Sequence, residues 1–79
     1  MRLDKFLKVS RVIKRRTVAN EACSAGRVTV NGKVAKAGLD VMVGDIIEIR
    51  FGSNLTKLEV LVLKENVRKE DAASMYRLL

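Results

Sequence analysis

The sequence predicts an α+β fold: two N-terminal helices packed on a small, mostly antiparallel sheet, followed by a C-terminal helix. Three observations predict it. Apolar residues recur at helical spacing before residue 24, runs of valine, isoleucine and leucine follow between residues 28 and 63 around glycine-containing turns, and a last helical stripe begins near residue 70. A chain of 79 residues is expected to form a single domain with one small core.

The N-terminal part of the chain is expected to form two short helices joined by a basic loop. The first covers residues 1–9 and turns three apolar side chains toward the core: Leu3, Phe6 and Leu7. Asp4 stands where it can cap that helix or complement the positive end of its dipole. After the loop of residues 10–16, Thr17 is the expected N-cap of the second helix, which ends at Gly26.

A hairpin and further strands are expected to follow the helices. Residues 27–36 form the hairpin, because Asn31-Gly32 is a dipeptide favoured in tight type I′ turns. Its apolar face is expected to consist of Val28, Val30 and Val34. Residues 46–51 alternate between apolar and polar, and residues 55–63 are predicted to form another strand. The apolar positions of the alternating run are Ile47, Ile49 and Phe51.

The last element is predicted to be an amphipathic helix that begins at Glu70 or Asp71, within a C-terminal strand and helix region of residues 55–79. Its stripe at i, i+3, i+4 and i+7 consists of Ala72, Met75, Tyr76 and Leu79. We expect this helix to dock on the sheet or its edge. The alternative is a free helix offered to a protein partner, which would make the chain an interaction adaptor.

The residue types disfavour an enzyme and a protein-built metal site, and no cofactor is expected. There is no histidine, Cys23 is the single cysteine, and the five glycines are spaced as turns rather than as a phosphate-cradling motif. Cys23 lies on the apolar stripe of the second helix and is interpreted as a buried core residue. No apolar run approaches the ~18 residues of a membrane span and no signal-peptide core is present, so a cytoplasmic protein is expected.

The positive charge is concentrated in the first half of the chain. Residues 1–36 hold ten Lys or Arg against two acids, whereas residues 37–79 hold six against seven. A basic surplus confined to one half indicates a polyanionic partner, with nucleic acid preferred over an anionic membrane. An ordinary solvated surface is the alternative interpretation of the same charge.

The segment of residues 10–31 is interpreted as a phosphate-binding surface. The polar residues of its loop are nearly all cationic, and the start of the second helix adds backbone N–H donors and a positive dipole end. Only three aromatic residues are present, so recognition of backbone shape in folded RNA is expected rather than stacking on bases. A helix-turn-helix DNA-binding module is a weaker alternative, because the second helix offers few base-reading side chains: Asn20, Glu21 and Ser24.

These residues resemble the RNA-binding domain named after ribosomal protein S-four, also called the alpha-L RNA-binding motif. The resemblance covers roughly residues 1–50. It is carried by Arg2-Leu3-Asp4-Lys5-Phe6-Leu7, Ser10-Arg11, Lys14-Arg15-Arg16-Thr17, Ala25-Gly26-Arg27-Val28-Thr29-Val30-Asn31-Gly32, and Val43-Gly44-Asp45 with Ile47.

Within this family, a stand-alone chain this short is similar to the heat-shock-protein-fifteen group and to its small relatives, the RqcP group. The absence of a long basic C-terminal extension favours the latter. The resemblance implies binding to the large ribosomal subunit after stalling, with ribosomal RNA (rRNA) and peptidyl-tRNA as partners. It also implies support for an RqcH-like factor that adds alanine tails to nascent chains; a monomer with no membrane partner is expected. A general ribosome-assembly or translation factor, or a DNA-binding module, remains the alternative.

The RNA contacts implied by the resemblance are the same residues that the charge pattern selects. Among them, Asn31 and Lys33 are the weaker candidates, since Asn31 has a sufficient role as a turn residue that tolerates positive φ. The full set is Arg2, Lys5, Arg11, Lys14, Arg15, Arg16, Arg27, Asn31 and Lys33.

Overall fold

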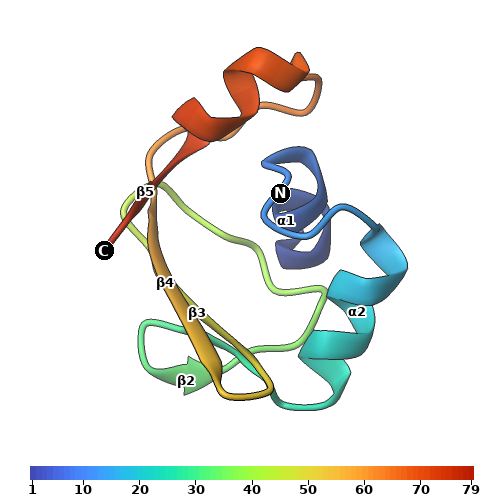
Figure 1. The fold of residues 1–79 in the computed structure, drawn as a ribbon. Helices are drawn as coiled ribbons and strands as arrows, with labels where there is room; N and C mark the ends of the chain where they lie inside the picture. Colours follow the sequence, from blue (N-terminus) through green and yellow to red (C-terminus); the bar gives the residue numbers. More distant parts are fainter.

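The computed structural model describes residues 1–79 and contains two α-helices, one 3₁₀ helix and five strands (Figure 1). The N-terminal helices are α1 (Leu3–Val9) and α2 (Arg16–Ser24). The other elements are β1 (Val28–Val30), β2 (Lys33–Val34), β3 (Ile46–Phe51), β4 (Asn54–Val60), η1 (Lys69–Met75) and β5 (Tyr76–Leu78).

The strands form one antiparallel sheet in the order β2-β1-β3-β4-β5. Figure 1 shows α1 and α2 on the same side of this sheet, while the segment from β4 to η1 arches over the end of the molecule near α1. The predicted α+β architecture with two N-terminal helices on an antiparallel sheet is confirmed.

One apolar cluster of 16 buried residues joins the helices to the sheet. Alternation along the strands sends Ile47, Ile49, Leu58 and Val60 toward the helices, and all four are at most 1% exposed. The predicted core residues of α1 are fully buried: Leu3, Phe6 and Leu7. Phe51, by contrast, is 38% exposed, because it lies at the end of β3.

Cys23 belongs to this core, as the sequence indicated. The residue is 3% exposed. Burial raises the pKa of its thiol, and the negative charge of Asp4 raises it further. The thiol is therefore protonated at neutral pH and packs as a small apolar group.

The hairpin has the predicted turn but a different buried face. Asn31 and Gly32 have φ values of 52° and 83°, which fit a type I′ turn. This two-residue turn pairs Thr29 with Val34, so Val34 shares the outer face with Thr29 and is 67% exposed. The prediction that Val34 belongs to the core face is wrong, and Ala35, which is 5% exposed, takes that place.

The C-terminal helix is shorter than predicted and is followed by a strand. Ala72 and Met75 in η1 are buried as expected, but Tyr76 begins β5, and Leu79 is 55% exposed. β5 pairs with the edge of β4, where backbone groups would otherwise lack partners. This pairing ends the helix before the predicted stripe is complete.

Two element boundaries also differ from the prediction. α2 begins at Arg16 rather than after Thr17, because Arg15 adopts the extended N-cap conformation without a side-chain capping bond. The predicted strand of residues 55–63 ends at Val60. The predicted end of the second helix is close to the observed one, since Gly26 with φ 74° follows the C-cap residue Ala25.

Candidate nucleic-acid interface

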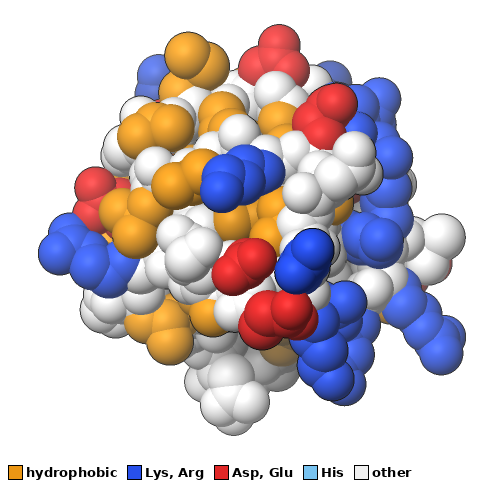
Figure 2. Space-filling model, turned by 90° about the horizontal axis from the view of Figure 1, so that it is seen from above, with side chains coloured by type: hydrophobic (Ala, Val, Ile, Leu, Met, Phe, Trp, Pro, Cys, Tyr) orange, Lys and Arg blue, Asp and Glu red, His pale blue; other side chains and the backbone are white.

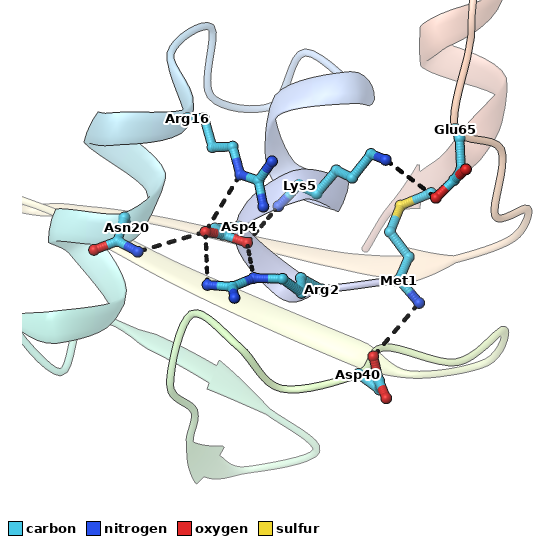
Figure 3. A network of polar contacts seen from close by, with 8 residues as sticks. All are labelled: Met1, Arg2, Asp4, Lys5, Arg16, Asn20, Asp40 and Glu65. Atoms are coloured by element: carbon cyan, nitrogen blue, oxygen red, sulfur yellow. Dashed lines mark hydrogen bonds and ion pairs between the residues drawn. The ribbon is translucent and has the colours of Figure 1, made fainter.

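A buried carboxylate in the first turn of α1 contacts one cation just before that helix and another at the start of α2 (Figure 3). The side chain of Asp4 is 3% exposed. Arg2 donates from Nε to Oδ1 over 3.1 Å and from an Nη atom to Oδ2 over 3.3 Å. Arg16, from the first turn of α2, places its Nε 3.4 Å from Oδ2.

Two neutral donors complete the environment of this carboxylate. The backbone N–H of Lys5 donates to Oδ1 over 2.8 Å, and Nδ2 of Asn20 donates to Oδ2 over 3.4 Å. Burial by itself raises the pKa of the carboxyl group. This effect is outweighed by the hydrogen bonds from Arg2, Asn20 and Arg16 and by the positive charge of Arg16, so the pKa is lowered from its usual value of 3.8. Asp4 is therefore ionised at neutral pH.

Arg2 and Arg16 form a cationic pair although they belong to different segments. Their side chains are 52% and 48% exposed, so the guanidinium groups still face solvent. A guanidinium carries five N–H donors, and the contacts to Asp4 leave several of them free for phosphate oxygens. Without the carboxylate between them the two guanidinium groups would repel each other, so Asp4 positions the pair. We call Arg2, Asp4 and Arg16 the Asp4 cluster.

The ammonium group of Lys5 contacts a distant part of the chain. Its Nζ lies 3.1 Å from Oε1 of Glu65, which ties α1 to the segment after β4 (Figure 3). This ion pair reduces the positive charge that Lys5 offers to a ligand.

The loop between α1 and α2 presents three exposed cations that make no ion pair: Arg11, Lys14 and Arg15. Ile13 anchors the loop in the core and is 6% exposed. Arg11 has a φ of 63°, in the left-handed region that residues other than glycine rarely adopt. Its N–H donates to the carbonyl oxygen of Lys8 over 3.1 Å, which closes the turn after α1.

The predicted residues of the hairpin lie away from the Asp4 cluster. Arg27 follows α2, whose nine residues extend for about 13 Å at the usual rise per residue. The sequence analysis assigned Arg27 and residues 14–16 to one phosphate-binding surface, but the length of α2 separates them in the structure. Figure 1 shows the loop of residues 10–15 and the β1–β2 hairpin near opposite ends of α2.

Asn31 is engaged within the protein. Its Nδ2 donates to Oδ1 of Asp45 over 3.1 Å, and its Oδ1 accepts from the N–H of Ile46 over 2.9 Å. These bonds fasten the hairpin turn to the start of β3, which supports the structural interpretation of Asn31. Lys33, at the start of β2, is exposed.

Lys and Arg side chains are unevenly distributed over the surface. Figure 2 shows them densest along the edge on which α2 and the preceding loop lie in Figure 1, whereas hydrophobic side chains are more frequent on the opposite half of that face. The structure thus brings Arg2 and Arg16 together around one acid and directs the ammonium group of Lys5 to Glu65. The cationic surface continues along the loop, and the hairpin residues lie apart.

Sequence reasoning missed the role of Asp4 and Asn20. Asp4 was expected only to cap or complement the helix dipole, and Asn20 was considered as a base-reading residue. The available signal was that Asp4 is one of only two acids among the first 36 residues and lies between two cations. An isolated acid inside a basic segment indicates a residue that forms ion pairs with its cationic neighbours and positions them. Its partner Arg16, however, could not be identified without the packing of α2 on α1.

The fold and its cationic edge define a small RNA-binding module, and comparison with known families agrees. Residues 1–47 match the model of the S4 domain. The chain therefore belongs to the S4 domain family. None of its helices has the length and apolar character that a membrane crossing requires.

Individual proteins and solved structures also resemble this chain over most of their length. The chain is 62% identical to a protein from Halalkalibacterium halodurans named RQC P-site tRNA stabilizing factor, over 96% of this chain and 86% of the relative. A protein of the same name from Bacillus subtilis is 54% identical over the whole chain and 92% of the relative. Among solved structures, heat shock protein 15 of Vibrio cholerae superposes with a TM-score of 0.92 at 30% identity, covering all of this chain and 81% of that one.

Proposed function

We propose that the protein is a cytoplasmic, non-enzymatic factor of ribosome-associated quality control. It binds the large ribosomal subunit after stalling, contacts rRNA and peptidyl-tRNA, and supports an RqcH-like factor in the alanine tailing of the nascent chain. The relatives named RQC P-site tRNA stabilizing factor support this proposal, because they match nearly the full length of the chain at more than half identity.

The observation that carries the proposal from the structure is the Asp4 cluster. It presents two half-exposed guanidinium groups that the carboxylate of Asp4 holds in a fixed relation (Figure 3). Such groups bind phosphate oxygens, and no aromatic platform is needed for that recognition. We assign the RNA contacts to Arg2, Lys5, Arg11, Lys14, Arg15 and Arg16, and more peripherally to Arg27, Asn31 and Lys33.

Binding should depend steeply on salt, because phosphate contacts release counterions. Engagement of about five phosphates gives a slope of log K against log salt on the order of −3.5 to −4.5. The measurement is a titration of labelled large subunits carrying peptidyl-tRNA at several salt concentrations. Binding that does not respond to salt would contradict the electrostatic account.

Arg16→Ala should weaken this binding and reduce the magnitude of the slope by about 0.7 to 0.9, the contribution of one phosphate. The matched control is Lys57→Ala, since Lys57 is a half-exposed cation on the sheet, 3.6 Å from Glu48. Equal binding to intact ribosomes and to subunits obstructed by peptidyl-tRNA would favour a general translation or assembly factor instead.

A further inference from the structure

A groove lies between the end of α1 and the segment after β4, outside the Asp4 cluster. Its volume is about 660 Å³. Four exposed cations line it: Lys8, Arg11, Lys14 and Arg68. Only Arg11 and Lys14 among them belong to the predicted RNA contacts, so Lys8 and Arg68 have no assigned role.

The groove is held open by packing on both of its walls. Val9 from α1 and Val67 from the opposite segment line it and pack against the hydrophobic core. The ion pair between Lys5 and Glu65 joins the same two segments at 3.1 Å. The two walls of the groove, which are more than 50 residues apart in sequence, are thereby held at a fixed distance from each other.

The charge of the groove is unbalanced. Glu65 is the single acid in its lining, and its carboxylate is already paired with Lys5. None of the four cations has a carboxylate within 4.0 Å. Cations gathered in this way repel one another, and a polyanion that enters the groove relieves that repulsion.

The turn at Arg11 contributes to this arrangement. Its left-handed backbone, with φ 63°, reverses the chain after α1, so that Arg11 and Lys14 line the same groove as Lys8. The left-handed conformation costs conformational free energy in a residue other than glycine, and this surface loop nevertheless keeps it at Arg11.

We propose that this groove binds the sugar-phosphate backbone of RNA and that Lys8 and Arg68 are part of the interface. The inference rests on the proposed function and extends it to the segment after β4, beyond the residues that match the S4 domain. The lining contains no aromatic residue, so it offers no surface on which bases could stack. Its cations and the amide of Asn66 suit phosphate and ribose oxygens.

The test compares double variants of the full chain in binding to fluorescently labelled tRNA across a salt series. The groove variant is Lys8→Ala/Arg68→Ala, and the control with the same loss of charge is Lys57→Ala/Arg77→Ala on the sheet. A third variant, Arg2→Ala/Arg16→Ala, reports on the Asp4 cluster. Thermal unfolding of each variant identifies any loss of fold before binding is compared.

The groove variant is expected to bind tRNA more weakly and to reduce the magnitude of the salt slope by about 1.4 to 1.8, as for two lost phosphate contacts. The control should keep the wild-type slope. If the groove variant binds like the wild type while Arg2→Ala/Arg16→Ala is weakened, the groove proposal is overturned and the proposed function stands. If the wild-type protein does not bind tRNA at all, the groove proposal is overturned, whereas the proposed function is decided by the titration of large subunits that carry peptidyl-tRNA.

Anionic vesicles containing phosphatidylglycerol distinguish RNA from a membrane as the occupant. Loss of vesicle binding by the groove variant, with unchanged tRNA binding, would assign the groove to a membrane surface and overturn the proposal.

Discussion

Replacement of Asp4 by asparagine distinguishes two explanations of RNA binding. In one, Asp4 must hold the two arginines in position; in the other, only the net charge of the protein matters. The substitution keeps the side-chain volume and an oxygen that accepts the N–H of Lys5, but it removes the negative charge between Arg2 and Arg16. The net charge of the protein rises from +7 by one unit. If charge alone governed RNA binding, Asp4→Asn would bind more tightly than the wild type.

The structure leads to the opposite expectation for binding. The two guanidinium groups are held by one buried carboxylate, and without its charge they would move apart into solvent. Asp4→Asn should therefore bind labelled tRNA more weakly, despite its extra positive charge. Glu70→Gln is the matched control, because it makes the same change of charge at an exposed acid that forms no ion pair or side-chain hydrogen bond with the cluster.

The effect on stability can be estimated from the contacts, with Asp4→Ala as the reference. Loss of the partner of the Lys5 N–H destabilises by about 1 kcal/mol. The ion pairs to the half-exposed arginines together contribute roughly 1 kcal/mol after solvent screening. A total of about 2 kcal/mol lowers Tm by roughly 8 to 16 °C in a chain of this size. Asp4→Asn should lose about half as much.

The assays are fluorescence anisotropy for tRNA and thermal unfolding followed by circular dichroism. Tighter binding by Asp4→Asn than by the wild type, at equal fold, would refute the positioning argument. Unchanged stability of Asp4→Ala would show that the buried contacts do not contribute.

Further predictions concern acid stability, the core and the thiol. Because the pKa of Asp4 is lower in the folded protein than in the unfolded chain, its contribution to stability should be complete above about pH 4 and lost as the pH falls through the folded pKa; acid unfolding curves of wild type and Asp4→Asn should converge at low pH. Phe6→Ala should leave the chain largely unfolded, since removal of a fully buried phenyl group destabilises by about 3 to 5 kcal/mol; a native-like circular dichroism spectrum would contradict this. Cys23 should react with a thiol reagent only slowly until denaturant is added, and rapid labelling of the folded protein would argue against its buried, protonated state.

Local patterns were sufficient to predict the fold class. The spacing of Leu3, Phe6 and Leu7 and the alternation through Ile47 and Ile49 depend on neighbours within a few residues, and the structure buries all five. The Asn31-Gly32 turn is similarly local.

The errors arise where distant contacts decide the outcome. Val34 was assigned to the core face by its apolar character alone, but the two-residue turn fixes the register and turns it outward. From Tyr76 onward the chain pairs with the open edge of β4 as a strand, although the local sequence continues the apolar stripe of a helix. The sequence of residues 70–79 alone contains no pattern that indicates this edge, so the strand could not be predicted from it.

The candidate interface was predictable in composition and less so in geometry. Counting charges identified Arg2 and Arg16, but their pairing depends on α2 packing across α1, which brings Asp4 between them. The charge pattern also assigned Arg27 to the same phosphate-binding surface as Arg16, because nearness in sequence gives no measure of the length of the helix between them.

The backbone at Arg11 has a consequence for how this surface is maintained. Its φ of 63° would suit glycine or asparagine, and an arginine there is disfavoured by about 1 to 2 kcal/mol. A protein selected for stability alone would not place a long cationic side chain at that position. Stability and ligand binding therefore make opposing demands on residue 11, and substitutions there should improve one property at the expense of the other.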